Sequence, residues 1–246
     1  LLCQTNTAMS KRTGEDIHGR YIELELLHND PPKMVTNLNV VAFAKYLKDK
    51  TGGEEDIEFF ANGFPLSLKP EGPDVDYNKL CQNVRHFART MREALVIIDT
   101  FIKEVKKTYL IPTDKKPKYI INLHCAPKKD TNGDYTALRM VRHGSYCTAQ
   151  TLALNDIIEP EACTMQLPHL KEYTKQLYGK KFAAMRDLKD AFRQLLLRAH
   201  EYKFCGYAMF GMYFLDTRQP YGIAPAAASC QRFAENLIWI FENHFL

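Results

Sequence analysis

Residues 181–197 read KFAAMRDLKDAFRQLLL, and this stretch carries the strongest indication of both fold and chemistry. An apolar run, Phe182–Met185, precedes a carboxylate at Asp187, and a second carboxylate follows at Asp190. A short buried strand that ends in an aspartate is a common way to hold a hard cation such as Mg²⁺, which prefers oxygen ligands. A surface turn that carries two solvated aspartates explains this stretch equally well. The segments that follow it decide between the two interpretations.

The segments downstream combine turn signals with apolar runs. Residues 203–217 read KFCGYAMFGMYFLDT, and the aromatic-rich runs on either side of Gly211 predict a β-hairpin. A turn rich in proline and glycine follows at Gln219–Ala226. Apolar residues then recur at the helical period, at Cys230, Phe233, Ala234, Leu237, Ile238 and Phe241. The predicted order is therefore a strand that ends in an aspartate, a hairpin, a turn and a long helix.

In order and in residue type, these segments resemble the palm of reverse transcriptases. Residues 187–192 (DLKDAF) resemble the first catalytic motif of the family, and residues 220–233, which begin with PYG, resemble its second conserved block. The motif DAFR, and the hairpin with its glycine and aromatic residues, are most similar to the corresponding segments in the polymerases of tyrosine-recombinase (DIRS-type) retrotransposons. The resemblance covers residues 85–246 and extends weakly over residues 36–75.

The resemblance implies an RNA-directed DNA polymerase, in which a primer 3′-hydroxyl attacks the α-phosphate of a deoxynucleoside triphosphate. Two Mg²⁺ ions stabilise the attacking and leaving oxygens in such a reaction, and Asp187 is the implied ligand of both. The backbone N–H groups of Asp190 and Ala191 are implied to hold the triphosphate. Phe192 is implied to lie beneath the sugar, where a bulky ring excludes a 2′-hydroxyl. A core position on a helical face is the alternative for Phe192.

The second block is implied to complete the same site. Tyr221 and Gly222 would form its floor, where glycine would allow the backbone to approach the nucleotide closely. Gln231 and Arg232, on the helix that follows, are implied to contact the template, although a solvated helix face explains them equally well. The implied partners are thus deoxynucleoside triphosphates and an RNA or DNA template with its primer.

A second hairpin is predicted upstream of this region. Residues 120–123 have the pattern of a strand, Asn132–Gly133 is a strong hairpin-turn signal, and residues 135–141 have the pattern of the returning strand. This unit resembles the fingers hairpin of reverse transcriptases, where a lysine and an arginine hold the incoming triphosphate. Arginine suits that role because its guanidinium can bind two phosphate oxygens at once.

The implied triphosphate ligands of this hairpin are Arg139 and a lysine that precedes the turn. Lys128 and Lys129 are both candidates for the lysine, and the sequence does not separate them. A basic hairpin whose side chains are merely solvated is the alternative interpretation. Further along, Asn155 is expected to stabilise a turn rather than to touch substrate.

The N-terminal part is predicted to be helical and partly disordered. Residues 1–34 are polar and end in prolines, which favours a poorly ordered lead-in or the tail of an upstream region. The pattern of residues 40–47 predicts a short amphipathic helix, and a pair of glycines marks its end. Residues 78–107 carry the longest helical pattern, with apolar side chains along one face, and Leu110–Pro112 is expected to end that helix.

The composition is that of an ordinary globular protein: 46% of the 246 residues are hydrophobic, 25% are charged and the formal net charge is +4. This mild positive charge is compatible with a nucleic-acid partner but does not require one. Seven cysteines without a pairing pattern predict free thiols in a reducing, intracellular compartment, either nucleus or cytoplasm. The sequence has neither a signal-peptide pattern nor the ~20 consecutive apolar residues of a membrane helix.

The expected fold is α+β: the fingers and part of the palm of a right-hand polymerase, behind a helical N-terminal extension. Residues 1–75 are assigned to the extension, 76–165 to the fingers with their connecting helix, and 166–246 to the partial palm. The third motif of the family, an aromatic-x-Asp-Asp turn, is missing, and the sequence contains no Asp-Asp dipeptide. We therefore expect a fragment with little or no polymerase activity on its own.

This truncation would also leave the final helix without its sheet partner. We therefore expect the apolar face of that helix, formed by Leu237, Ile240 and Phe241, to be exposed. The alternative function is a non-catalytic nucleic-acid-binding or interaction module derived from a reverse transcriptase.

Overall fold

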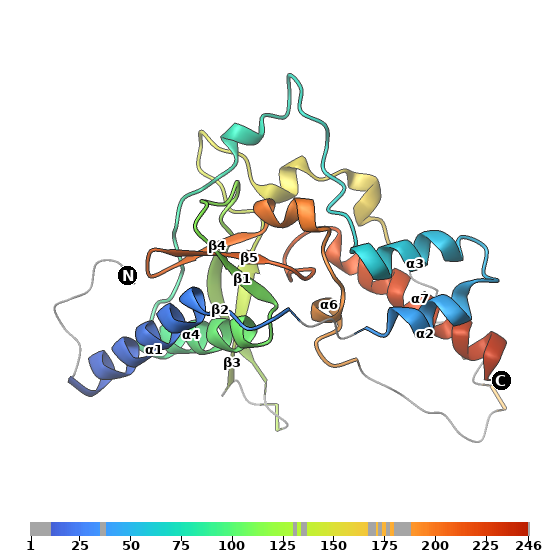
Figure 1. The fold of residues 1–246 in the computed structure, drawn as a ribbon, viewed down its shortest axis with the longest axis horizontal. Coiled ribbons are helices and arrows are strands. Elements are labelled where there is room, and N and C mark those ends of the chain that lie inside the picture. The colour runs from blue at the N-terminus through green and yellow to red at the C-terminus, as the bar shows by residue number, and fades with distance from the viewer. Residues whose placement is uncertain are drawn as a thin grey trace.

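The computed structural model of this chain describes residues 11–34, 38–129, 132–133, 137–166, 171, 174–175, 178–179 and 188–245, with only the backbone of residues 11–16. Helices and strands are mixed along the chain (Figure 1). The α-helices are α1 (Lys11–Asn29), α2 (Val40–Leu47), α3 (Gly53–Asn62), α4 (Met91–Lys106), α6 (Ala191–Gln194) and α7 (Ala226–His244). The strands are β1 (Leu110–Thr113), β2 (Asn122–Lys128), β3 (Ala137–His143), β4 (Gly206–Met209) and β5 (Met212–Asp216). Short 3₁₀ helices are η1 (Tyr77–Lys79), η2 (Leu154–Ile157), η3 (Pro160–Cys163) and η4 (Ala199–Phe204).

One sheet has three antiparallel strands in the order β1-β5-β4. β4 and β5 form the hairpin predicted around Gly211, and the turn residues Phe210 and Gly211 have φ angles of 52° and 85°. Positive φ at both central residues gives a turn whose twist matches that of the strands. β1 pairs with β5, so residues 110–113, which the sequence suggested only as the end of a helix, form an edge strand.

β2 and β3 form a separate antiparallel pair, which is the hairpin predicted from the Asn132–Gly133 turn. Both strands begin two residues later than the sequence suggested. Leu123 and Met140, from the two strands, pack into the larger hydrophobic core together with α4. The hairpin is therefore attached to the core by one face.

Helix α4 begins at Met91, later than the predicted start at residue 78. A capping box sets this start: Thr90 Oγ1 accepts the N–H of Glu93, and a Glu93 carboxylate oxygen accepts the N–H of Thr90, both at 3.2 Å. The preceding segment is extended, because the N–H of Phe87 donates to the carbonyl of Leu123 at 2.8 Å. The expectation of one continuous helix is therefore wrong for its first part, where Phe87 pairs with β2 and Val84 is exposed.

Residues 11–29, expected to belong to a poorly ordered lead-in, form α1, which packs against α4. Leu24 is fully buried there, and Arg20 Nε lies 2.5 Å from Asp99 Oδ1 on α4. The expectation is wrong for these residues because contacts with a distant helix stabilise a segment whose own sequence signal is weak.

A smaller core lies between α7 and the pair α2–α3 (Figure 1). Phe60 of α3 contacts Phe233 of α7, with 5.8 Å between ring centroids. Leu237 is partly buried in this core and Ile240 is 7% exposed, whereas Phe241 is 58% exposed. The expected exposure is therefore wrong for Leu237 and Ile240 and confirmed for Phe241, because α2 and α3 cover one side of the helix. None of the described helices is long and apolar enough to cross a membrane.

Candidate functional site

Asp187, the predicted metal ligand, lies outside the described residues. Asp190, three positions later, precedes α6 in a left-handed backbone conformation, with φ 52° and ψ 39°. The Asp190 side chain is 41% exposed, and its carboxylate lies 3.5 Å from Nζ of Lys107, at the end of α4. Asp190 is thus accessible to solvent, with a positively charged partner beside it.

The structure brings together two residues that the sequence predicted for nucleotide binding. Phe192 on α6 and Tyr221 on the turn before α7 lie 4.7 Å apart between ring centroids, with an interplanar angle of 61°. Phe192 is half-buried, and Tyr221 is 38% exposed. Burial, and then the negative charge of Asp190, raise the pKa of Tyr221. We refer to Asp190, Ala191, Phe192, Tyr221 and Gly222 as the candidate nucleotide site.

The turn that carries Tyr221 is held by its neighbours. Gly222 has a φ of 85°, and a Cβ at this position would lie 2.3 Å from the carbonyl oxygen of Arg142 on β3. Asn155 Nδ2 donates to the Gly222 carbonyl at 3.0 Å, and Asn155 Oδ1 accepts the N–H of Ala224 at 3.0 Å. The predicted role of Asn155 in stabilising a turn is confirmed, and glycine is needed because a side chain would not fit against β3.

The predicted triphosphate ligands lie on the β2–β3 hairpin. Arg139 lies opposite Ala126, and Lys128 lies opposite Ala137, so Arg139 and Lys128 project from the same face of the hairpin. Both side chains are exposed. Lys128 is the last residue of β2 and Lys129 lies just beyond it, so the strand register places only Lys128 on a defined face of the hairpin. Contact of these side chains with a triphosphate stays a prediction.

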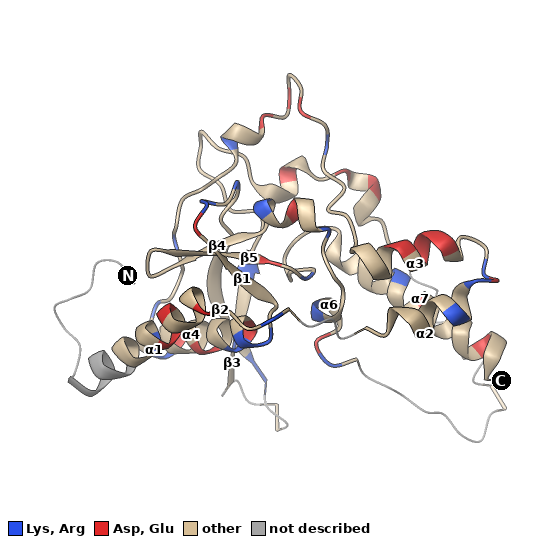
Figure 2. Cartoon of the chain, in the orientation of Figure 1, with Lys and Arg blue, Asp and Glu red and all other residues tan. Residues whose placement is uncertain are grey.

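Gln231 and Arg232, predicted to contact the template, are bound to other parts of the chain. Arg232 Nη2 lies 2.7 Å from a Glu55 carboxylate oxygen, and Arg232 Nε donates to Asp56, so the arginine joins α7 to the acidic residues gathered on α3 (Figure 2). Gln231 Nε2 donates to the carbonyl of Gln166 at 2.7 Å. Both side chains line a cavity of about 600 Å³ between α3 and the start of α7. These contacts favour a structural role for Arg232, and a template contact stays a prediction.

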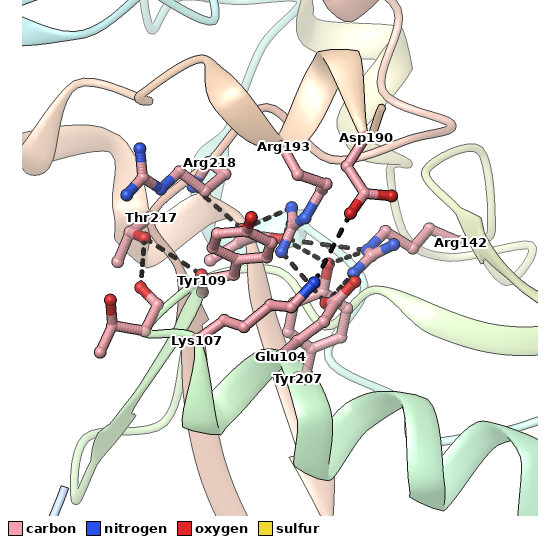
Figure 3. Close-up of polar contacts among 11 residues, drawn as sticks. Glu104, Lys107, Tyr109, Arg142, Asp190, Arg193, Tyr207, Thr217 and Arg218 are labelled. Carbon is pink, nitrogen blue, oxygen red and sulfur yellow. Dashed lines mark hydrogen bonds and ion pairs between the residues drawn. The ribbon is translucent and has the colours of Figure 1, made fainter. Parts of the chain in front are cut away.

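A closed ring of buried polar side chains, which the sequence did not predict, lies next to the candidate nucleotide site (Figure 3). Arg193 Nη1 donates to both carboxylate oxygens of Asp216, at 2.8 and 2.9 Å, and Arg193 Nη2 lies 3.1 Å from Glu104 Oε2. Glu104 Oε2 also accepts from Arg142, whose Nε donates to the Tyr207 hydroxyl at 2.7 Å. The Tyr207 hydroxyl closes the ring by donating to Asp216 Oδ2 at 2.7 Å. We call Glu104, Arg142, Arg193, Tyr207 and Asp216 the polar ring.

Each member of the polar ring comes from a different element: α4, β3, α6, β4 or β5. Arg142, Arg193, Tyr207 and Asp216 are at most 4% exposed, and two carboxylates balance two guanidinium groups. Burial raises the pKa of Tyr207, so its phenol stays protonated and able to donate. The sequence signal for this ring is a charged residue, Arg193, just before the apolar run Leu195–Leu197, and that signal does not reveal the partners.

The described residues do not form a metal site. Within the described ranges, no group of three or more histidine, cysteine, aspartate or glutamate side chains could hold a metal ion. The carboxylates of Asp216, which is buried, and Glu104, which is partly buried, already accept hydrogen bonds from the other members of the polar ring. The Mg²⁺ site implied by the resemblance therefore depends on Asp187, and it stays a prediction.

No protein-family model matches this sequence, and no curated protein matches it. Among solved structures, the chain is similar to a foamy viral protease-reverse transcriptase in complex with double-stranded DNA. The two chains share 15% sequence identity, with a TM-score of 0.49 over 87% of this chain. This chain spans 37% of the length of that protein. These values do not identify a family, and they give no support to the DIRS-type subgroup.

Proposed function

We propose that this chain is a piece of a reverse-transcriptase-like polymerase whose candidate nucleotide site binds a deoxynucleoside triphosphate beside a primer–template. The observation that carries the proposal is the contact between Phe192 and Tyr221. The two residues come from the two sequence blocks that resemble the first and second motifs of reverse transcriptases. If both resemblances were accidental, there would be no reason for the fold to bring the two blocks together at an exposed position.

The chemistry of this region suits a nucleotide. The ring of Phe192 offers apolar surface to the sugar, and we propose that it lies against C2′, where it would exclude a hydroxyl group. The exposed cations Lys128 and Arg139, on one face of the β2–β3 hairpin, would bind phosphate oxygens. The backbone N–H groups of Asp190 and Ala191 would bind the remaining phosphate oxygens at the start of α6.

A non-catalytic nucleic-acid-binding module is the second candidate function, and one observation favours it. The carboxylates of Glu104 and Asp216, beside the candidate nucleotide site, are bound to guanidinium groups rather than free to hold a cation. Nucleotidyl transfer with two Mg²⁺ ions would therefore rest on Asp187, whereas nucleic-acid binding would not need that residue.

Primer extension and equilibrium binding separate the two functions. We expect the protein to bind a primer annealed to an RNA template, as measured by fluorescence anisotropy, and to extend it at most weakly, because the sequence has no Asp-Asp dipeptide. Asp187→Asn should abolish extension and leave the affinity for the primer–template unchanged. Asp114→Asn, which alters an exposed carboxylate after β1, is the matched control and should change neither property. Binding without extension by the unaltered protein would favour the module, and the absence of both would contradict both proposals.

A further inference from the structure

The polar ring contacts the first segment of the candidate nucleotide site through Arg193. Arg193 directly follows Phe192 on α6, and its guanidinium is held by Asp216 at 2.8 Å and by Glu104 at 3.1 Å. Helix α6 has four residues and no side-chain cap, so it is too short to maintain its own geometry. The buried guanidinium therefore helps to hold the α6 segment, and with it the Phe192 ring, together with the backbone hydrogen bond from the Gln219 N–H to the Leu195 carbonyl at 2.9 Å.

The second segment of the site is held by the same ring. Asp216 Oδ1 accepts the N–H of Arg218 at 3.0 Å, just before the turn that carries Tyr221. The carbonyl of Arg142 lies against Gly222 in that turn, at the place where a Cβ would be. Asp216 and Arg142 thus support the Tyr221 segment. Asp216 also binds Arg193, which directly follows Phe192.

A closed ring of buried ion pairs is sensitive to the loss of any one member. Removing one hydrogen bond leaves its partner buried without a replacement, which costs more than the bond itself contributed. The remaining charged groups then shift to recover contacts. Arg193 and Phe192 are joined by one peptide bond, so a shift that displaces the backbone at Arg193 would move the Phe192 ring relative to Tyr221.

We propose that the polar ring sets the distance between Phe192 and Tyr221, and that it thereby determines how strongly the site discriminates against a ribonucleotide. Tyr207 and Arg193 are positioning residues, because they act on the nucleotide through Phe192 and not by touching it. This inference rests on the proposed function, since it concerns the selectivity of the same site. A misplacement of about 1 Å can cost about 100-fold where groups must fit closely, so a smaller displacement of the Phe192 ring is measurable.

The test removes one hydroxyl group from the polar ring. Tyr207→Phe deletes the hydroxyl that accepts from Arg142 and donates to Asp216, and it keeps the packing of the aromatic ring. Kd values for dATP and ATP, which differ at the 2′ position, are measured on the complex with a 3′-blocked primer and an RNA template. We expect the preference for dATP to fall about 10-fold, with unchanged affinity for the primer–template. Tyr77→Phe, whose hydroxyl donates to the Lys69 carbonyl at 2.5 Å, is the matched control and should keep the preference.

Arg193→Lys gives a second measurement if Tyr207→Phe does not fold, because lysine keeps the charge but cannot bind Asp216 and Glu104 through a planar fork. An unchanged preference in both variants, with a loss of preference in Phe192→Ala, would overturn this inference and leave the proposed function intact. Equal affinity of the unaltered protein for dATP and ATP would also overturn it. Failure of the unaltered protein to bind either nucleotide would overturn the proposed function and this inference together.

Discussion

The ring of Phe192 lies 4.7 Å from the ring of Tyr221, centroid to centroid, although the two residues belong to segments on opposite sides of the β4–β5 hairpin in the sequence. The backbone next to Phe192 is held by the buried side chain of Arg193, a member of the polar ring, whereas Tyr221 lies on an exposed turn. The contact therefore joins a rigid, buried support to an accessible surface. This combination is what a site needs in order to select a ligand by shape.

Replacing Phe192 with alanine should reduce the preference for dATP over ATP about 10-fold, because the ring proposed to exclude the 2′-hydroxyl would be gone. The preference should fall because the affinity for ATP rises, while the affinity for dATP changes little. Equilibrium titration of both nucleotides against the complex with a blocked primer measures the two constants. Phe241→Ala, which removes an aromatic ring that is 58% exposed on α7, is the control. A preference that survives Phe192→Ala would contradict the position proposed for this ring.

Gly222 and Gly211 have the same φ, 85°, but different surroundings. A Cβ at Gly222 would meet the Arg142 carbonyl at 2.3 Å, whereas none of the described atoms lies within 4 Å of a Cβ at Gly211. Alanine should cost about 1–2 kcal/mol at either position because of the left-handed backbone. Gly222→Ala should lower the free energy of unfolding clearly further than Gly211→Ala, because the turn must also move away from β3. Urea unfolding of the two variants measures the difference, and equal losses would show that the turn moves freely.

Asp56 should make the stability of the protein depend on acid pH. Burial by itself would raise its pKa, but hydrogen bonds from Lys50 and Arg232 outweigh this effect and lower the pKa. A carboxyl group with a lowered pKa in the folded state contributes stability above its unfolded pKa of about 4, and that stability is lost as the pH falls through the folded value. Asp56→Asn should therefore lose about 2 kcal/mol at neutral pH and show a flatter dependence below pH ~4.

The measurement for Asp56 is the free energy of unfolding from urea titrations between pH 2 and pH 7. Asp49→Asn alters an exposed carboxylate close to the same helices and should reproduce the curve of the unaltered protein. If Asp56→Asn retained the full acid dependence, the contacts of Asp56 with Lys50 and Arg232 would not stabilise the fold.

Phe233→Ala should destabilise the protein by about 3–5 kcal/mol, because the ring is 4% exposed and its removal leaves a cavity beside Phe60. Phe241→Ala deletes the same number of atoms from the same helix, but its ring is 58% exposed, so the loss should stay below about 1 kcal/mol. Thermal and urea unfolding measure both values. Small, equal losses would mean that α2 and α3 do not cover α7 in solution.

Elements that depend on neighbouring residues were predicted well from the sequence. Asn132–Gly133 and Gly211 indicated the two hairpins, and the apolar period after Ala226 indicated α7. The backbone preferences of two turn residues, or the spacing of apolar residues along one helix, are visible in a short stretch of sequence. Elements of this kind can therefore be predicted without information about distant residues.

Elements that depend on distant partners were predicted poorly. The apolar spacing upstream of Met91 predicted a helix, but Phe87 pairs with Leu123, and the segment is extended. The polar N-terminal residues predicted disorder, but Leu24 is buried against the rest of the fold. In each case the free energy gained by contact with a remote segment outweighs the local conformational preference. That preference contributes less free energy than the burial of one side chain.

The sequence by itself determined which side chains the candidate nucleotide site contains, since the DLKDAF and PYG motifs are contiguous and their types are visible directly. Only the tertiary structure decided that Phe192 meets Tyr221, that Lys128 shares a face with Arg139, and that Arg193 is buried against other charged groups. The physical reason is that a local pattern shows which groups must be buried or paired, whereas the packing of distant segments selects the partner of each group.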